Sequence, residues 1–278
     1  MTMQEKGSSS PAAAPARGGK YPPALPPAGN NATGILKLIA LCFMLIDHLG
    51  AVVFPGIQEM RILGRIAFPI YCWCLVVGFH YTRSVPRYLR RILLVGIISQ
   101  PLYAYVMNHV GTTGNLIYDW MLNKPNIFLT LFLGLAALWG LREKWYGSQF
   151  WGPFAAICLA TVLDVDYGWR GVMFILLLYG ARNSRSAVAA VMIAFFLYWG
   201  TLYRVTSSLF GIPIDLNLLP EFLSAPLSAF LRMETYGLMA LPFILIRFRK
   251  DLRMAAWLSY GIYPAHLLIV WAVKVLVK

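Results

Sequence analysis

Long apolar runs, separated by short charged segments, recur along this chain from Ile35 to Val277. A run of about 20 apolar residues is long enough to cross a bilayer as a helix, and a succession of such runs is typical of a polytopic membrane protein. Nine spans are predicted, at residues 35–54, 62–81, 92–107, 127–141, 150–163, 171–181, 187–203, 227–246 and 255–275. The pattern therefore predicts an all-α bundle of transmembrane helices.

The number of spans depends on two short runs. Residues 150–163 and 171–181 are short for a bilayer about 30 Å thick, which needs about 20 helical residues. One alternative is eight spans, with one of these segments re-entrant and lining a water-filled pocket. The size of the chain also allows ten.

Composition and charge support the membrane class. The chain is 59% hydrophobic and 13% charged, whereas a soluble domain carries about 25% charged residues. The net charge of +13 does not indicate nucleic-acid binding, because the basic residues lie in short clusters between apolar runs and form no stripe interleaved with aromatic residues. The positive-inside rule explains them better.

The distribution of charge also predicts an orientation. Residues 1–34 are rich in Pro, Ala, Gly and Ser and are predicted to form a disordered cytoplasmic tail, followed by one helical domain at 35–278. Most basic residues lie in this tail and in the loops after the even-numbered spans, while acidic residues gather in the opposite loops. The N-terminus is therefore expected in the cytoplasm.

The first span carries Lys37, Asp47 and His48. Lys37 and His48 are eleven positions apart, and at about 100° per residue they share one helix face, with a rise of roughly 16 Å between them. Ionisable groups inside a span are costly and mark candidate functional sites. His48 can act as a general base. The alternatives are a His48 satisfied by a neighbouring helix and a Lys37 that extends to the cytoplasmic interface.

Asp47 could orient His48 or pair with a cation on another helix. Arg65, at the start of the second span, is the candidate cation, although it could also extend to the outer headgroups. Pro69 is expected to kink that span, and Pro264 is expected to open the last span beside His266.

Polar residues outside these spans give a weaker signal. Asp164 and Asp166 flank a tight turn that continues with Tyr167, so they could receive an acceptor amine or hydroxyl group, or simply form an interfacial turn with an aromatic belt. Asn126 could cap the fourth helix. Arg232 and Glu234 lie in the eighth apolar run, where each needs a partner elsewhere unless the helix starts later.

The sequence contains no P-loop, Rossmann fingerprint, GxSxG or HExxH motif. Nucleotide-driven transport and serine hydrolysis therefore have no support, and no metal cofactor is expected.

Several motifs, in this order along the chain, resemble the TraX family of conjugation-associated membrane proteins, acetyltransferases of the pilin N-acetylase type. The matching stretches are Lys37 to Asp47-His48, Gly64-Arg65 to Phe68-Pro69, Asn126 to Phe128, Tyr167-Gly168 with Gly171, and Pro264 to His266-Leu267. That family is distantly similar to the acyltransferase-three superfamily, which carries Arg, ten residues and His in its first span. Lys37 stands at the Arg position here, and it offers a point charge in place of a bidentate fork.

The resemblance implies a protein of the bacterial inner membrane and acyl transfer with acetyl-CoA as donor. Lys37 would hold the phosphate-rich part of the donor, and His48 would take a proton from the acceptor while Asp47 orients it. Arg65 or His266 would stabilise the oxyanion, with Tyr167 and Asn126 in positioning roles and Asp164 and Asp166 at the acceptor. The acceptor would be a pilin N-terminus, another protein, a glycan or a lipid. The competing hypotheses are a membrane transporter or flippase and a non-catalytic subunit of a pilus, conjugation or secretion machine.

Overall fold

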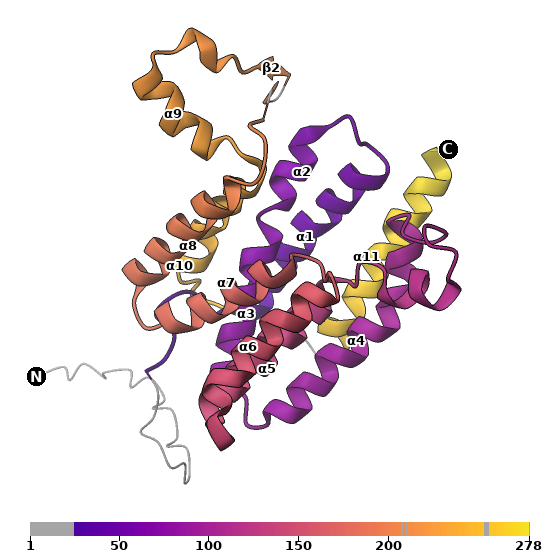
Figure 1. The fold of residues 1–278 in the computed structure, drawn as a ribbon, viewed down its shortest axis with the longest axis vertical. Coiled ribbons are helices and arrows are strands. Elements are labelled where there is room, and N and C mark those ends of the chain that lie inside the picture. The colour runs from indigo at the N-terminus through magenta and orange to yellow at the C-terminus, as the bar shows by residue number, and fades with distance from the viewer. Residues whose placement is uncertain (1–24, 207, 210, 253–255, 278) are drawn as a thin grey trace, which may run out of the picture.

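The computed structural model describes residues 25–277 apart from 207, 210 and 253–255, and these residues form an all-α protein (Figure 1). Its α-helices are α1 (Thr33–Val52), α2 (Gln58–Gly64), α3 (Ala67–Tyr81), α4 (Val85–Val106), α5 (Ile127–Glu143), α6 (Ser148–Val162), α7 (Gly168–Ala181), α8 (Arg185–Gly200), α9 (Glu221–Phe230), α10 (Leu241–Leu245) and α11 (Ala256–Val277). Shorter helical turns occupy Tyr118–Leu122, Trp145–Gly147, Leu216–Leu218 and Met233–Ala240, and β1 (Ser208–Leu209) pairs with β2 (Ile212–Pro213). The all-α part of the predicted fold class is confirmed.

Helix α3 lies at the centre of the bundle. It is apolar on all sides, and eleven of its residues are buried, as expected of a helix that is surrounded by others. Helix α1 packs against α2, α3 and α11, and α4 packs against α5 and α11. Helices α5, α6 and α7 pack against one another. The largest fully buried side chains include Trp73, Phe68 and Phe174.

Some residues before the first predicted span pack against the bundle. Residues 1–24, most of the predicted tail, lie outside the described residues. Asn30 is fully buried, its side chain donates a hydrogen bond to the carbonyl of Phe243 at 3.0 Å, and its own carbonyl accepts from the Trp73 indole at 2.7 Å. Residues 25–34, predicted to continue the disordered tail, therefore pack against α3 and α10 or form the first turn of α1.

The second predicted span is interrupted. Helix α2 ends at Gly64 and α3 begins at Ala67, with a turn at Arg65 and Ile66. Pro69 has no backbone N–H, so the carbonyl of Arg65 receives no helical hydrogen bond from it. The helix is thus interrupted one turn before the proline.

The eighth predicted span, residues 227–246, is wrong as a single helix. Helix α9 ends at Phe230, and Arg232 forms an isolated β-bridge with Val205. The chain then continues as the 3-10 helix Met233–Ala240 and the short α10. The interruption places Arg232 and Glu234 against polar partners that a continuous helix facing lipid would not offer.

Among the described residues, two helical stretches, Thr33–Val52 and Gln58–Tyr81, are long and apolar enough to cross a membrane. Four others are apolar but shorter: Gly168–Ala181, Arg185–Gly200, Met233–Leu245 and Gly261–Val277. Nine spans therefore remain a prediction.

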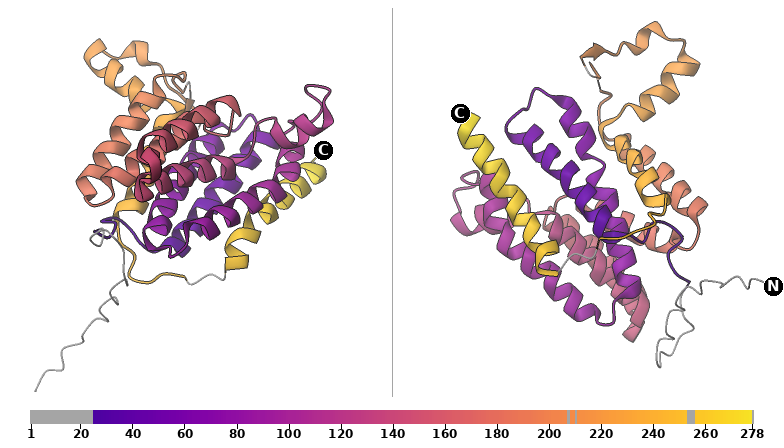
Figure 2. Two further views of the ribbon diagram at one scale, coloured as in Figure 1. Left: turned by 60° about the horizontal axis from the view of Figure 1, so that its bottom comes forward. Right: turned by 180° about the vertical axis from the view of Figure 1, so that it is seen from behind.

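An arm formed by β1, β2 and α9 projects beyond the end of the bundle where α2 also lies (Figures 1 and 2). Its base is closed by the Val205–Arg232 bridge and by two hydrogen bonds from the Arg232 guanidinium to the carbonyls of Thr201 and Tyr203. None of the residues of α9 is buried.

Candidate active site

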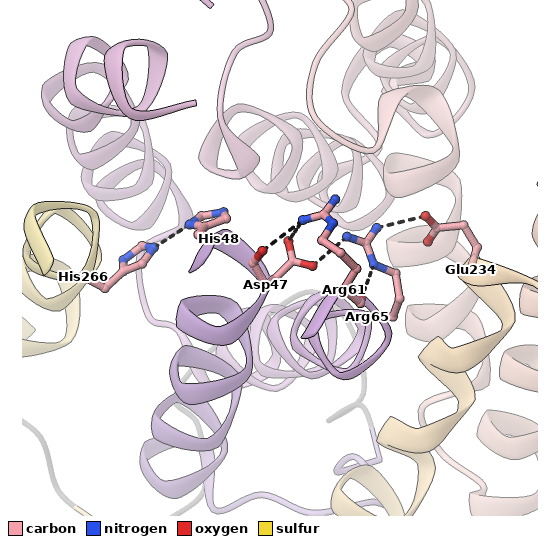
Figure 3. A network of polar contacts seen from close by, with 6 residues as sticks. All are labelled: Asp47, His48, Arg61, Arg65, Glu234 and His266. Atoms are coloured by element: carbon pink, nitrogen blue, oxygen red, sulfur yellow. Dashed lines mark hydrogen bonds and ion pairs between the residues drawn. The ribbon is translucent and has the colours of Figure 1, made fainter. Parts of the chain in front are cut away.

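Two histidines from opposite ends of the chain meet inside the bundle. Nδ1 of His48, on α1, lies 3.0 Å from Nε2 of His266, on α11, and the rings stack with their centroids 5.1 Å apart (Figure 3). Both are buried, at 7% and 2% exposure. The contact joins the two histidines that the sequence singles out separately.

Asp47 points away from His48 into a cluster of charged side chains (Figure 3). Its two carboxylate oxygens accept from Arg61 Nη1 at 2.6 Å and from Arg65 Nη2 at 2.9 Å. Nη1 of Arg65 also donates to Glu234 at 2.9 Å, and Nε of Arg65 donates to the carbonyl of Arg61. Of the two predicted roles of Asp47, the structure shows the pairing with cations. Both Arg61 and Arg65 bind carboxylates.

The local sequence explains this cluster. Gly64 faces α1, and a Cβ at this position would overlap the Asp47 side chain. Only glycine therefore lets α2 approach closely enough for Arg61 and Arg65 to reach Asp47. The turn between α2 and α3 then directs Arg65 toward Glu234 as well.

A polar cavity of about 140 Å³ adjoins the cluster. His48 lies on its wall, whereas His266 does not and lies behind His48. Tyrosines from α4, the α6–α7 turn and α11 close other sides. The lining residues are Met44, Asp47, His48, Arg61, Gly64, Arg65, Ala67, Tyr103, Met107, Ile127, Asp166, Tyr167 and Tyr263.

A second cavity of about 260 Å³ shares the wall residues Arg65, Asp166 and Tyr167 with the first. Tyr167 is held in place by stacking on Phe68, with ring centroids 3.8 Å apart. We call this second space the outer cavity. It is lined by Arg65, Lys124, Asp164, Val165, Asp166, Tyr167, Gly168, Arg170, Trp199, Tyr203 and Glu234.

The two loop aspartates differ in environment. Asp164 is largely exposed and forms an ion pair with Lys124. It lines the outer cavity but not the His48 cavity. The Asp166 carboxylate lines both cavities, and within the described part of the chain it accepts no hydrogen bond. Burial raises the pKa of Asp166 to about 6; Arg65 opposes this rise and Asp47 adds to it. Asp166 is therefore the stronger candidate for contact with a ligand.

Lys37 lies in a separate cavity of about 60 Å³, with Tyr71, Cys74, Leu75, Tyr88, Ile92, Phe128 and Leu131. Both cavities are lined from α4 and α5, so the predicted shared face of α1 is confirmed. Phe128 packs edge-on against Tyr263, which lines the His48 cavity, at a centroid distance of 4.6 Å. The two ends of the face are thus separated by aromatic rings.

Asn126 does not line the His48 cavity. Its side chain caps α5 by accepting from the amide of Phe128 at 3.0 Å, and it donates to the carbonyl of Gly96 at 2.9 Å. Its expected positioning role is therefore replaced by the capping role. Conversely, Tyr103 and Tyr263 line the site without any signal in the sequence, because tyrosines are common in apolar helices. Glu234 did carry a signal in the sequence, because it is a charged residue in an apolar run.

Comparison with known proteins gives a family. A probable fimbrial assembly protein, FimC of serogroup H1 from Dichelobacter nodosus, is 33% identical over 108 residues, covering 37% of this chain and 43% of that protein. An uncharacterized protein of Rickettsia prowazekii (strain Madrid E) is 26% identical over 162 residues, covering 56% of this chain and 58% of that protein. The chain spans about half the length of these curated relatives, and no solved structure matches it. The model of the TraX protein family matches residues 32–274, and the chain therefore belongs to that family.

Proposed function

We propose that this protein is a membrane-bound acetyltransferase that moves an acetyl group from acetyl-CoA to an amine or hydroxyl acceptor, with His48 as general base. The observation that carries the proposal is the placement of His48 on the wall of a polar cavity, held from behind by His266 and flanked by paired arginines. Membership of the TraX family supports the same reaction.

In the proposed reaction, His48 moves the proton. Nε2 of His48 would take a proton from the acceptor as its nitrogen or oxygen attacks the thioester carbonyl. The tetrahedral intermediate then breaks its C–S bond, and the His48 imidazolium returns the proton to the CoA sulfur. The products are the acetylated acceptor and free CoA.

Arg65 is the residue best placed to stabilise the oxyanion. Its three hydrogen bonds to described residues use Nε and one N–H on each Nη atom, so two of its five N–H donors remain. A fixed cation on the cavity wall is worth more there than in water, because the site is shielded from solvent.

The acceptor is expected from the outer cavity. Asp166 and Tyr167 lie where the two cavities meet, so an acceptor that fills the outer cavity would pass them on its way to His48. Asp164, which is exposed and paired with Lys124, would have a weaker role at the entrance. The name of the fimbrial assembly relative supports a protein acceptor, such as a pilin N-terminus.

The donor is expected from the opposite end of α1. Cavities of about 60 and 140 Å³ fit the narrow thioester end of acetyl-CoA and exclude its nucleotide. To reach His48, the thioester end would have to pass the contact between Phe128 and Tyr263. The phosphates would therefore remain outside, near Lys37 and the exposed arginines of α4, Arg87, Arg90 and Arg91. Helix α4 also contributes Tyr88 to the Lys37 cavity. This arrangement agrees with an inner-membrane protein whose N-terminal side faces the cytoplasm.

The test is CoA release by the purified full chain in detergent, with acetyl-CoA and membrane extract or pilin-like peptides as acceptors. His48→Ala should lower the rate about 10²- to 10⁴-fold. His80→Ala is the matched control, because His80 lines neither of the cavities that contain Arg65, and it should retain the rate.

Full acetyl transfer by His48→Ala would contradict the catalytic role. Absence of acetyl-CoA binding and of CoA release from the wild type would contradict the enzyme. A transporter would move its substrate without releasing CoA, and a scaffold subunit would tolerate both His48→Gln and Lys37→Ala.

A further inference from the structure

We propose that His266 is a positioning residue that holds His48 in one tautomer, with the proton on Nδ1 and the lone pair on Nε2 facing the cavity. The expected effect on catalysis rests on the proposed function. The tautomer itself is a property of the resting protein and does not depend on that function. It replaces the expected oxyanion role of His266, because that residue lies behind His48 and off the cavity wall.

The distance between the rings permits two arrangements. Between two neutral imidazoles at 3.0 Å, one nitrogen must carry the hydrogen and the other must accept it. Either Nδ1–H of His48 donates to Nε2 of His266, or Nε2–H of His266 donates to Nδ1 of His48. Only the first leaves a basic nitrogen of His48 in the cavity.

The surroundings of His266 favour the first arrangement. Nδ1 of His266 is buried and has no aligned hydrogen-bond partner among the described residues, and the backbone groups of Ile262 and Tyr263, one turn earlier, interact with the ring. Side chains on a helix lean toward the preceding turn, whose carbonyls attract an N–H and repel a lone pair. A proton on Nδ1 of His266 leaves Nε2 of that ring as the acceptor for His48.

The free nitrogen of His48 is consistent with this tautomer. Nε2 of His48 makes no hydrogen bond within the described residues, and it is not one of the fully buried polar atoms that lack a partner. This nitrogen is therefore not fully buried. Asp47, the neighbour that could otherwise hold the ring, is occupied by Arg61 and Arg65. His266 is therefore the group left to orient His48, and it continues to accept from Nδ1–H when Nε2 takes a proton.

The tautomer can be read directly from the ¹⁵N spectrum of the full chain in micelles, labelled at histidine. The sequence has four histidines, so single variants such as His48→Gln and His80→Gln assign the signals. At pH 7.5 we expect a protonated Nδ1 and an unprotonated Nε2 for His48. A proton on Nε2 of His48 would overturn the proposal. The correct tautomer without any CoA release would instead leave the positioning intact and contradict the enzyme.

Two variants separate positioning from packing. His266→Met fills the space without an acceptor, so His48 should show both tautomers, and kcat should fall about tenfold or more while KM for acetyl-CoA stays unchanged. His266→Gln offers a side-chain oxygen that can accept from Nδ1–H, and it should restore most of the rate. A His266→Met protein that retains one tautomer and the full kcat would overturn the proposal. If that variant does not fold, the wild-type spectrum alone decides.

Discussion

The two ends of the α1 face differ in what surrounds them. His48 lies beside a cavity whose wall carries Asp47, Arg61, Arg65 and Asp166, whereas the smaller cavity at Lys37 is lined mostly by aromatic and aliphatic side chains. At the His48 end, the charged side chains are held by ion pairs with one another. At the Lys37 end, the cavity presents one cation to a ligand. Substitutions at the first end should affect stability and chemistry, and substitutions at the second should affect affinity.

The largest effect is expected at Arg65, the shared partner of two buried carboxylates. Arg65→Met would leave Asp47 with Arg61 alone and Glu234 without a cation. Removing one member of a buried ion pair costs about 3–5 kcal/mol, since the remaining charge is left uncompensated. Unfolding in detergent, followed by circular dichroism, should show this loss, and CoA release should fall with it.

Arg61→Met is the matched control within the same cluster. The Arg61 side chain is 34% exposed, against 10% for Arg65, so its ion pair with Asp47 is screened by solvent and worth about 1 kcal/mol or less. Equal losses for both variants would show that Arg65 is not the centre of the cluster.

Asp166→Asn is expected to make the protein more stable and less active. Because burial raises the pKa of Asp166 to about 6, the ionised form is disfavoured in the folded state. The stability of the wild type relative to Asp166→Asn should fall as pH rises from about 4 to about 6, and the gain of the variant above pH 6 should be about 1–3 kcal/mol. The measurement is unfolding of both proteins between pH 4 and pH 8.

Asp164→Asn is the control for this prediction, because its exposed carboxylate should change stability by less than about 0.5 kcal/mol at any pH. If acceptor turnover falls equally in both variants, Asp166 is not the main contact of the acceptor on the wall that the two cavities share. If Asp166→Asn shows no pH-dependent gain, the pKa of Asp166 is not raised in the folded protein.

Sequence patterns predicted what lies within one element and missed most of what lies between elements. The shared face of Lys37 and His48 follows from helix geometry alone, and the charges of Asp47 and Glu234 were visible as costly in apolar runs. Arg65 was predicted as the partner of Asp47, and the structure confirms it. The partner of Glu234 and the contact between the two histidines were not visible, because Arg65 and Glu234 are 169 positions apart and His48 and His266 are 218 apart. The break of the eighth run likewise depends on a bridge to Val205, which no local pattern contains. For Asn126 the sequence left a capping role and a site role open, because the two look alike in one sequence, and the structure shows the cap.

The smallest effect is expected at Lys37, and it isolates the donor end of the face. Lys37→Met should raise KM for acetyl-CoA about tenfold with kcat unchanged, because a phosphate contact far from His48 binds ground state and transition state equally. Lys37→Arg should lower KM by a few fold, because a guanidinium can meet a phosphate with two parallel hydrogen bonds. Initial rates of CoA release over a range of acetyl-CoA concentrations measure KM and kcat for both variants. The comparison requires that each variant is as stable as the wild type. A fall in kcat for Lys37→Met would mean that the aromatic layer at Phe128 and Tyr263 does not insulate the two ends, and that the charge at Lys37 reaches the chemistry.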